Sequence, residues 1–297
     1  MSRELEEIQS LLSASAPHLL GEAIEERARS EEKTVWSVGD HVVRRANSTP
    51  VRDLFRREHR LLHHVRGRVS LGVPTPLFIT ATGEFDILKK APGEPVGFEW
   101  WPSLDAASQE RIAGHFGRFL AELHEIFPFE TARVMGFERS FWPPSADWIE
   151  SRLRGRLVSP ERRTLLEGVV RAAPWIHAEV LPPVLLHDDF CHHNAGFSDD
   201  GKQVLGAFDF THARIGDPHR DLRYAFTFEP FAETMIREYE RTRGLELDRR
   251  RLRAWHAWSA LAYLAWDLTE GDAQRLPMRW GWVDQLAAWG RDFLDVE

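Results

Sequence analysis

Cysteine is almost absent from this sequence: among 297 residues, Cys191 is the only one. A lone cysteine cannot form a disulfide within the chain, and it excludes a structural zinc site built from several cysteines. Long apolar runs are also missing, because none approaches the roughly 20 residues that a membrane-spanning helix needs. The acidic start of the chain is not typical of a signal peptide. We therefore expect a cytoplasmic protein that makes no contact with a membrane.

An excess of positive charge is absent as well. The formal net charge is −8, and residues 1–94 are balanced, so the negative excess lies wholly in residues 95–297. An acidic domain disfavours nucleic acid as a partner and attracts cations, although the same charge also serves solubility. We therefore expect no nucleic-acid partner.

The first 90 residues are predicted to form a small α+β domain. Two short strands flank a turn at residues 39–40, and a second hairpin covers residues 76–90. Between them, residues 47–65 have the apolar periodicity of a helix, with Thr49 as its cap and Pro50 in its first turn. The Pro- and Gly-rich stretch that follows residue 90 is a connector, so the predicted domains are 1–90 and 91–297.

The second domain is predicted to be mainly helical. Apolar residues recur at helical spacing over residues 112–123, and another helix is expected to begin at Pro160. Two short β runs, 183–187 and 204–210, enclose the stretch that carries most of the chemically reactive side chains.

Within that stretch, acidic and amide side chains follow the order that phosphoryl transfer requires. The order is His187-x-Asp189-x4-Asn194, and Asp209 ends the next β run. In phosphoryl transfer, one Asp accepts the proton of the attacking hydroxyl or fixes its direction, while an Asn and a second Asp hold Mg²⁺ through oxygen atoms. Asp189, Asn194 and Asp209 match these requirements in type and in order.

The stretches HDDFCHHN and GAFDFTHARIGDPHRDL resemble the aminoglycoside phosphotransferase family, whose fold is similar to that of eukaryotic protein kinases. The resemblance covers roughly residues 20–225. It implies a bilobal α+β fold, with a small N-terminal lobe of antiparallel sheet and one helix and a larger, mainly helical C-terminal lobe. The residues that it assigns to catalysis are Asp189 as the base, Asn194 and Asp209 as the magnesium ligands, and His187 and Asp221 as braces of the loop.

The N-terminal domain tests this resemblance independently. Glu58 lies on the apolar stripe of the helix that follows Pro50, where a carboxylate needs a partner unless it reaches water at the edge of the stripe. In a kinase-like fold the partner is a cation on the third strand, which also contacts the nucleotide phosphates. Arg44 fits that place, although its guanidinium stands where the family usually has Lys.

Four further residues concern the nucleotide and the base. The expected phosphate-covering loop, residues 27–34, has no glycine, and Ser30 is the hydrogen-bond donor expected there. The hinge that binds the purine is expected at Lys90 and Ala91, and the choice between ATP and GTP stays open. Asp188 stands where the family often has Gly, so it is expected to add negative charge beside the base.

A metal-dependent phosphohydrolase is an alternative for the same stretch. Its ligands would be the clustered histidines and aspartates, namely His187, Asp188, Asp189, His192 and His193. Such an enzyme would not need the flanking β runs or Asp209. Without a metal, His192 and His193 are expected to face solvent, and Cys191 is expected to be a loop thiol rather than a nucleophile.

A nucleotide-binding P-loop is a weaker alternative. The sequence GFSDDGKQ ends in Gln203, where a P-loop has the Ser or Thr that ligates magnesium, and two aspartates inside it would repel phosphates. A hairpin turn at residues 198–201 is the better interpretation.

Together these features predict a small-molecule O-phosphotransferase that uses Mg²⁺ and moves the γ-phosphate of ATP or GTP to an acceptor hydroxyl. The first candidate acceptor is an aminoglycoside antibiotic. Choline-like alcohols, macrolides and sugars stay open, as does a pseudokinase that binds nucleotide without transferring phosphate. The chain is expected to act as a monomer.

A cationic acceptor is expected because the C-terminal tail interleaves acids with large aromatic residues, which suits carboxylate–ammonium and cation–π contacts. Asp267 is the first acid expected to contact the acceptor, and Glu229 is the second. Most of the tail tryptophans have helical spacing and are expected in the core.

Overall fold

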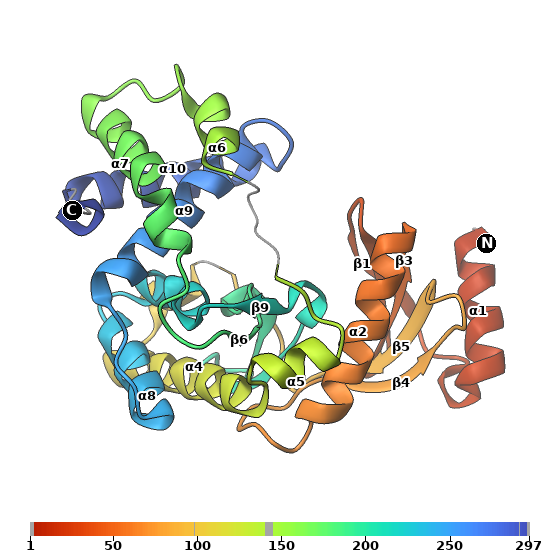
Figure 1. The fold of residues 1–297 in the computed structure, drawn as a ribbon. Helices are drawn as coiled ribbons and strands as arrows, with labels where there is room; N and C mark the ends of the chain where they lie inside the picture. Colours follow the sequence, from red (N-terminus) through yellow and green to blue (C-terminus); the bar gives the residue numbers. More distant parts are fainter. Residues whose placement is uncertain (1–2, 98, 140–144, 291, 296–297) are drawn as a thin grey trace. The chain divides into compact units, whose positions relative to one another are not determined.

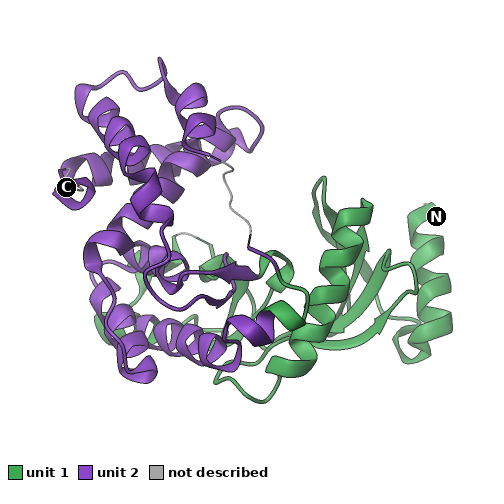
Figure 2. Ribbon diagram, viewed as in Figure 1, with its two compact units in different colours: residues 1–112, 133–137, 189–213 green, residues 113–132, 138–188, 214–297 purple. Residues whose placement is uncertain are grey.

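The computed structural model describes residues 3–97, 99–139, 145–290 and 292–295. The chain divides into two compact units, shown in different colours in Figure 2. Unit 1 comprises residues 1–112, 133–137 and 189–213, and unit 2 comprises residues 113–132, 138–188 and 214–297. The segment that carries Asp189, Asn194 and Asp209 therefore belongs to the same unit as the N-terminal sheet.

These units correct the prediction of two consecutive domains, 1–90 and 91–297. The chain beyond residue 90 stays in unit 1 because its backbone pairs with the later segment: Glu94 pairs with Phe197, and Gly72 pairs with Gly206. A connector rich in Pro and Gly marks a change of local structure, but it does not reveal that a distant segment returns to pair with it.

Unit 1 is built on a five-stranded antiparallel sheet with the strand order β1-β2-β3-β5-β4 (Figure 1). The strands are β1 (Ile24–Arg29), β2 (Lys33–Val38), β3 (His41–Ala46), β4 (Thr75–Ile79) and β5 (Phe85–Lys89). Both predicted hairpins are confirmed, and Gly39 and Gly83 have the positive φ that their turns require. Strand β1 was not predicted, because its residues are mostly exposed and show no apolar alternation.

Two helices cover opposite faces of this sheet. Helix α1 (Arg3–Ser15) packs Ile8 and Leu12 against the face that carries Val43, whereas α2 (Thr49–Val65) packs Phe55 against the face that carries Ala46. The faces differ because side chains alternate along β3. Arg44 is two residues before Ala46 on β3, so both side chains lie on the α2 face. Lys33 is paired with Ala46 and Asp86 is paired with Arg44, so these two side chains lie on the same face.

Helix α2 confirms the helix predicted over this region, with one correction. Its N-cap residue is Ser48, and Thr49 is already helical. Pro50 lies in the first turn, where a missing N–H costs no hydrogen bond.

The later segment of unit 1 is a hairpin with a 3-10 turn on each side. It comprises η2 (His192–Asn194), β7 (Ala195–Phe197), β8 (Val204–Ala207) and η3 (Phe210–His212). The predicted turn at residues 198–201 is confirmed, which excludes a P-loop there. Gly196 allows the hairpin to lie close to the connector, because a Cβ at this position would be 2.2 Å from the backbone oxygen of Pro92.

Unit 2 is mainly helical and contains one short sheet. Helices α4 (Ala106–Ile126) and α5 (Phe129–Val134) straddle the two units, and α3 (Trp100–Ser103) belongs to unit 1. The helices within unit 2 are α6 (Ala146–Leu153), α7 (Pro160–His177), α8 (Ala232–Arg243), α9 (Arg249–Asp267), α10 (Leu276–Ala288) and the 3-10 helix η4 (Pro218–Phe228). Its strands, β6 (Val184–Leu186) and β9 (Arg214–Gly216), pair antiparallel.

The core of unit 2 lies where α6, α7, α9 and α10 gather in Figure 1. Trp255 and Trp258 on α9 are buried, and Trp280, Trp282 and Trp289 pack against the same core. The prediction that most tail tryptophans are core residues is therefore confirmed. Among the described residues, no helix has the length and apolar composition needed to cross a membrane.

Candidate active site

Asp189 and Asn194, predicted as base and metal ligand, lie in direct contact. The side-chain nitrogen of Asn194 donates to the backbone oxygen of Asp189 at 2.8 Å and to its carboxylate Oδ2 at 2.9 Å. The 3-10 turn η2 brings the two residues together. Because the amide nitrogen is used in these bonds, the amide oxygen, which is the atom that a magnesium ion binds, points elsewhere.

Asp209, the second predicted metal ligand, carries an ionised carboxylate. Its Oδ1 accepts hydrogen bonds from the ammonium of Lys33 at 2.6 Å and from the hydroxyl of Thr211 at 2.7 Å. Burial by itself raises the pKa of Asp209, but the Lys33 ammonium outweighs burial and holds the pKa well below its ordinary value. Sequence reasoning missed Lys33, which lies on β2 and is distant from Asp209 in the chain.

Arg44 and Glu58 form the predicted ion pair. NH1 of Arg44 lies 2.7 Å from Oε2 of Glu58, and both residues are buried, which excludes the alternative that Glu58 reaches water. Arg44 also binds Asp86 through two parallel bonds, from Nε at 3.0 Å and from NH2 at 2.5 Å. Burial lowers the pKa of Arg44, but Asp86 and Glu58 together raise it well above its ordinary value. The part that Asp86 plays in this network was not predicted, because the alternation of side chains along β5 does not reveal which residue Asp86 contacts.

Glu58 connects α2 to the segment that follows Asp209. Its Oε1 accepts the backbone N–H of Phe210 at 3.0 Å, and its Oε2 lies 3.3 Å from the hydroxyl oxygen of Thr211. A continuous chain of polar contacts therefore runs from Asp86 through Arg44 and Glu58 to Asp209, entirely within unit 1.

The predicted brace Asp221 binds the backbone that leads into Asp189. Its carboxylate accepts the N–H of His187 at 2.8 Å and of Asp188 at 2.7 Å, and Nε2 of His124 lies 3.0 Å from it. All of these residues belong to unit 2 and are buried. The sequence analysis did not identify His124 as a partner of Asp221. Its position on the apolar stripe of α4, four residues after Leu120, indicates a buried polar side chain that needs such a partner.

The expectation that Asp188 adds negative charge beside the base is wrong. Its carboxylate is buried and bound by Nε of Arg220 at 2.5 Å, by Nε of Arg214 at 2.7 Å and by NH1 of Arg223 at 3.3 Å. Three guanidinium groups more than neutralise it. Asp188 also has φ +67°, a backbone conformation that Gly adopts freely and Asp tolerates.

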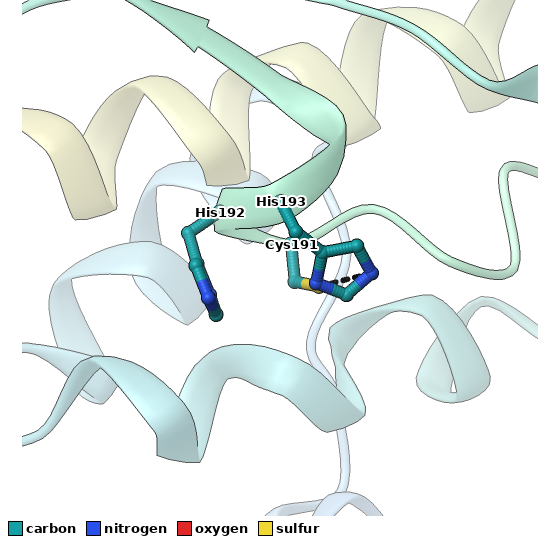
Figure 3. A group of neighbouring side chains, drawn as sticks. All are labelled: Cys191, His192 and His193. Atoms are coloured by element: carbon teal, nitrogen blue, oxygen red, sulfur yellow. Dashed lines mark hydrogen bonds between the residues drawn. The ribbon is translucent and has the colours of Figure 1, made fainter. Parts of the chain in front are cut away.

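Cys191, His192 and His193 form the one group of potential metal ligands of this kind found among the described residues (Figure 3). Sγ of Cys191 lies 2.9 Å from Nδ1 of His193, and one ligand atom from each of the three side chains lies within 4.8 Å of the others. His193 is exposed as predicted, but His192 is buried, so its prediction as a solvent-facing residue is wrong. The phosphohydrolase site is further weakened because the arginines already bind Asp188.

The remaining nucleotide-binding predictions concern residues with local partners. Ser30 is exposed, and its hydroxyl accepts the N–H of Lys33 at 3.1 Å, which closes the turn between β1 and β2. The ammonium of Lys90 binds the hydroxyl of Ser37 at 2.7 Å, and Ala91 is buried.

The two predicted acceptor-binding acids have different environments. Asp267 is buried at the end of α9, and its Oδ2 accepts Nε of Arg279 at 2.8 Å. This environment disfavours the predicted contact of Asp267 with a cationic acceptor, because an internal cation already neutralises the carboxylate. Glu229 is exposed at the end of η4, and partial burial raises the pKa of its carboxyl.

The sequence pattern of the phosphotransferase enzyme family (APH) matches residues 24–287. The chain belongs to this family. It is accordingly a member of a family of phosphotransferases, and the predicted kinase-like fold class is confirmed. No curated protein sequence gives a significant match.

Solved structures with the same fold include three that illustrate the range of this family. The GDP complex of wild-type aminoglycoside 2'-phosphotransferase-IIIa is 20% identical, with a TM-score of 0.75 over 97% of this chain and 99% of that chain. The streptomycin–ATP complex of APH(2")-IIa is 16% identical, with a TM-score of 0.63 over 100% and 99%. The macrolide 2'-phosphotransferase MphH from Brachybacterium faecium is 19% identical, with a TM-score of 0.65 over 95% and 98%.

Proposed function

We propose that this protein transfers the γ-phosphate of ATP or GTP, with Mg²⁺, to a hydroxyl of a small cationic acceptor, and that an aminoglycoside is the first acceptor to test. The observation that carries the proposal is the Asp189–Asn194 contact, which lies in one unit with an ionised Asp209. A proton acceptor and two oxygen ligands are the parts that phosphoryl transfer to an alcohol needs from a protein.

The donor set fits magnesium. Mg²⁺ is a hard cation that prefers oxygen, and the carboxylate of Asp209 with the amide oxygen of Asn194 supplies a charged and a neutral oxygen ligand. When bound, the ion would neutralise phosphate oxygens and orient the nucleotide. The Lys33 ammonium holds the pKa of Asp209 well below its ordinary value, so this ligand is ionised at neutral pH.

Asp189 would accept the proton of the acceptor hydroxyl, or fix the direction of that hydroxyl, as the oxygen attacks phosphorus. Asn194 fixes the orientation of the Asp189 carboxylate through the bond to Oδ2. Asp221 fixes the backbone immediately before Asp189 by accepting two successive amide hydrogens. Positioning of this kind accounts for most of the catalysis in phosphoryl transfer.

The acceptor class rests on the structural neighbours. These include aminoglycoside phosphotransferases in complex with kanamycin, gentamicin and streptomycin, and others are macrolide phosphotransferases. Macrolides are the second candidate class for a specific reason: Asp267 is neutralised by Arg279, which removes one of the two acids expected to attract a polycation.

The test is a panel of acceptors with Mg·ATP and Mg·GTP. Aminoglycosides, macrolides, choline and neutral sugars are each incubated with the enzyme, and mass spectrometry detects the gain of one phosphoryl group. Asp189→Asn serves as the inactive control, and Asp199→Asn, in the exposed turn after β7, serves as the matched control for removing an acid. The proposal expects phosphorylated aminoglycoside. Phosphorylation of a macrolide alone would contradict the acceptor class, and no phosphorylated product from any acceptor would contradict the proposal.

A further inference from the structure

We propose that Lys33 on β2, rather than Arg44 on β3, is the cation that binds the nucleotide phosphates in this enzyme. The inference deepens the proposed function and rests on it, since it names a residue that would bind the nucleotide. It comes from how the two cations on the α2 face of the sheet are engaged by neighbouring carboxylates.

Arg44 is committed to structural contacts. Three of its N–H groups bind carboxylate oxygens, two on Asp86 and one on Glu58, and its guanidinium lies 4.4 Å from the ring centroid of Phe55. Asp86 and Glu58 are themselves buried, at 0% and 1% exposure. Withdrawing Arg44 toward a phosphate would leave two buried carboxylates without their cation, which costs several kcal/mol.

Lys33, unlike Arg44, can leave its present contacts at little cost. Its ammonium contacts Asp209 at 2.6 Å and Thr211 at 3.3 Å, and an ammonium has three N–H donors, so a third can bind a ligand. The side chain keeps 15% exposure, and Asp209 keeps 29%. A flexible four-carbon side chain can turn from a carboxylate to an adjacent phosphate without breaking a buried network.

The backbone of Lys33 is fixed where such a contact is needed. Lys33 is the first residue of β2 and directly follows the turn that was expected to cover the phosphates. Ser30 stabilises that turn: its hydroxyl accepts the N–H of Lys33, and its backbone oxygen accepts the side-chain amide of Asn47 at 2.9 Å. The turn has no glycine and carries Glu31 and Glu32, so its own charge repels a triphosphate. A lysine at its base supplies the missing positive charge.

A magnesium ion at Asp209 would release Lys33 from its present partner. Asp209 would hold the ion through its carboxylate, which is the group that Lys33 contacts now, and the Lys33 ammonium would then be available to bind a phosphate. The Lys33–Asp209 pair is, on this view, the resting contact of a phosphate-binding lysine.

Direct binding measurements test this inference without turnover. Isothermal titration of Mg·ATP and Mg·GTP is compared for the wild type, Lys33→Met, Lys33→Arg and Lys202→Met, where Lys202 is an exposed lysine paired with Asp105. We expect Lys33→Met to weaken triphosphate binding about 10- to 100-fold, as loss of a charge-assisted hydrogen bond does. Lys33→Arg should recover part of the affinity, and Lys202→Met should change nothing.

Two further readouts keep the outcome decisive. Affinity for the nucleoside alone should be equal in wild type and Lys33→Met, and the melting temperature shows that the variant is folded. Unchanged or tighter triphosphate binding by folded Lys33→Met would overturn the inference, because it would make Lys33 only a counter-ion that competes with magnesium. A wild-type protein that binds neither nucleotide would instead contradict the proposed function itself.

Discussion

Asn194 donates its side-chain amide to the carboxylate of Asp189 at 2.9 Å, across a single 3-10 turn. The hydrogen bond joins the group assigned to the acceptor hydroxyl with a group assigned to magnesium. Because this bond joins the two side chains within one short loop, the position of the metal ligand and the direction of the carboxylate are set together.

Asp189→Asn should lower kcat by about 10²–10⁴, the usual effect of removing a positioned acid–base group. The amide has nearly the same shape, so Mg·nucleotide affinity should stay within about threefold of the wild type. Steady-state kinetics and isothermal titration measure the two effects separately. If Asp189→Asn turns over at nearly the wild-type rate, Asp189 is not the base; Asp199→Asn controls for the loss of an acid.

Asp209→Asn should remove most of the magnesium dependence of nucleotide binding, since it replaces the anionic ligand with a neutral one. The measurement is nucleotide titration in excess Mg²⁺ and in EDTA. In the wild type the two affinities should differ strongly, and in the variant they should converge. A variant that keeps the full magnesium effect would show that the ion is bound elsewhere.

Arg44 and Glu58 should be strongly coupled in stability. Truncating either one leaves a buried charge, at a cost of about 3–5 kcal/mol, so Arg44→Met and Glu58→Gln should combine with a coupling of about 0.5–3 kcal/mol. The pair Arg118 and Glu122 on α4, in which Arg118 is exposed and Glu122 is half-buried, is the control, with an expected coupling of at most about 0.5 kcal/mol. Denaturant unfolding measures both cycles, and additive effects of Arg44→Met and Glu58→Gln would contradict the contact.

Stability should fall as the pH drops from about 6.5 toward 4. Burial lowers the pKa of His256 to about 4, so this ring is neutral in the native state but takes up a proton when the chain unfolds below its ordinary pKa. The unfolded state therefore binds more protons in this window, and acid favours unfolding. His256→Gln should make the fall less steep, by about 2 kcal/mol between pH 7.5 and 5. An unchanged pH dependence would mean that His256 titrates normally.

The sequence predicted the features that local chemistry determines. Glu58 on an apolar stripe required a cation, and the strand order of a kinase-like fold pointed to Arg44. The order of Asp189 and Asn194 predicted their roles because both occur in one short loop.

Contacts between distant segments were not predictable in the same way. Lys33 and Asp209 are 176 residues apart in the sequence, and alternation along β2 predicts only the face on which a side chain lies. Asp188 looked like an added charge because its three arginines follow it much later in the sequence. Asp267 was predicted to contact the acceptor because its partner Arg279, which lies on α10, could not be recognised from the sequence.

The most direct test of the central claim is transfer of the terminal phosphate from γ-labelled ATP or GTP to an acceptor hydroxyl in the presence of Mg²⁺. The account predicts that label appears on an aminoglycoside with the wild type and not with Asp189→Asn. It also predicts that the acceptor KM rises with salt, because exposed charge pairs are screened. Label on no acceptor, or equal labelling by Asp189→Asn, would contradict the account.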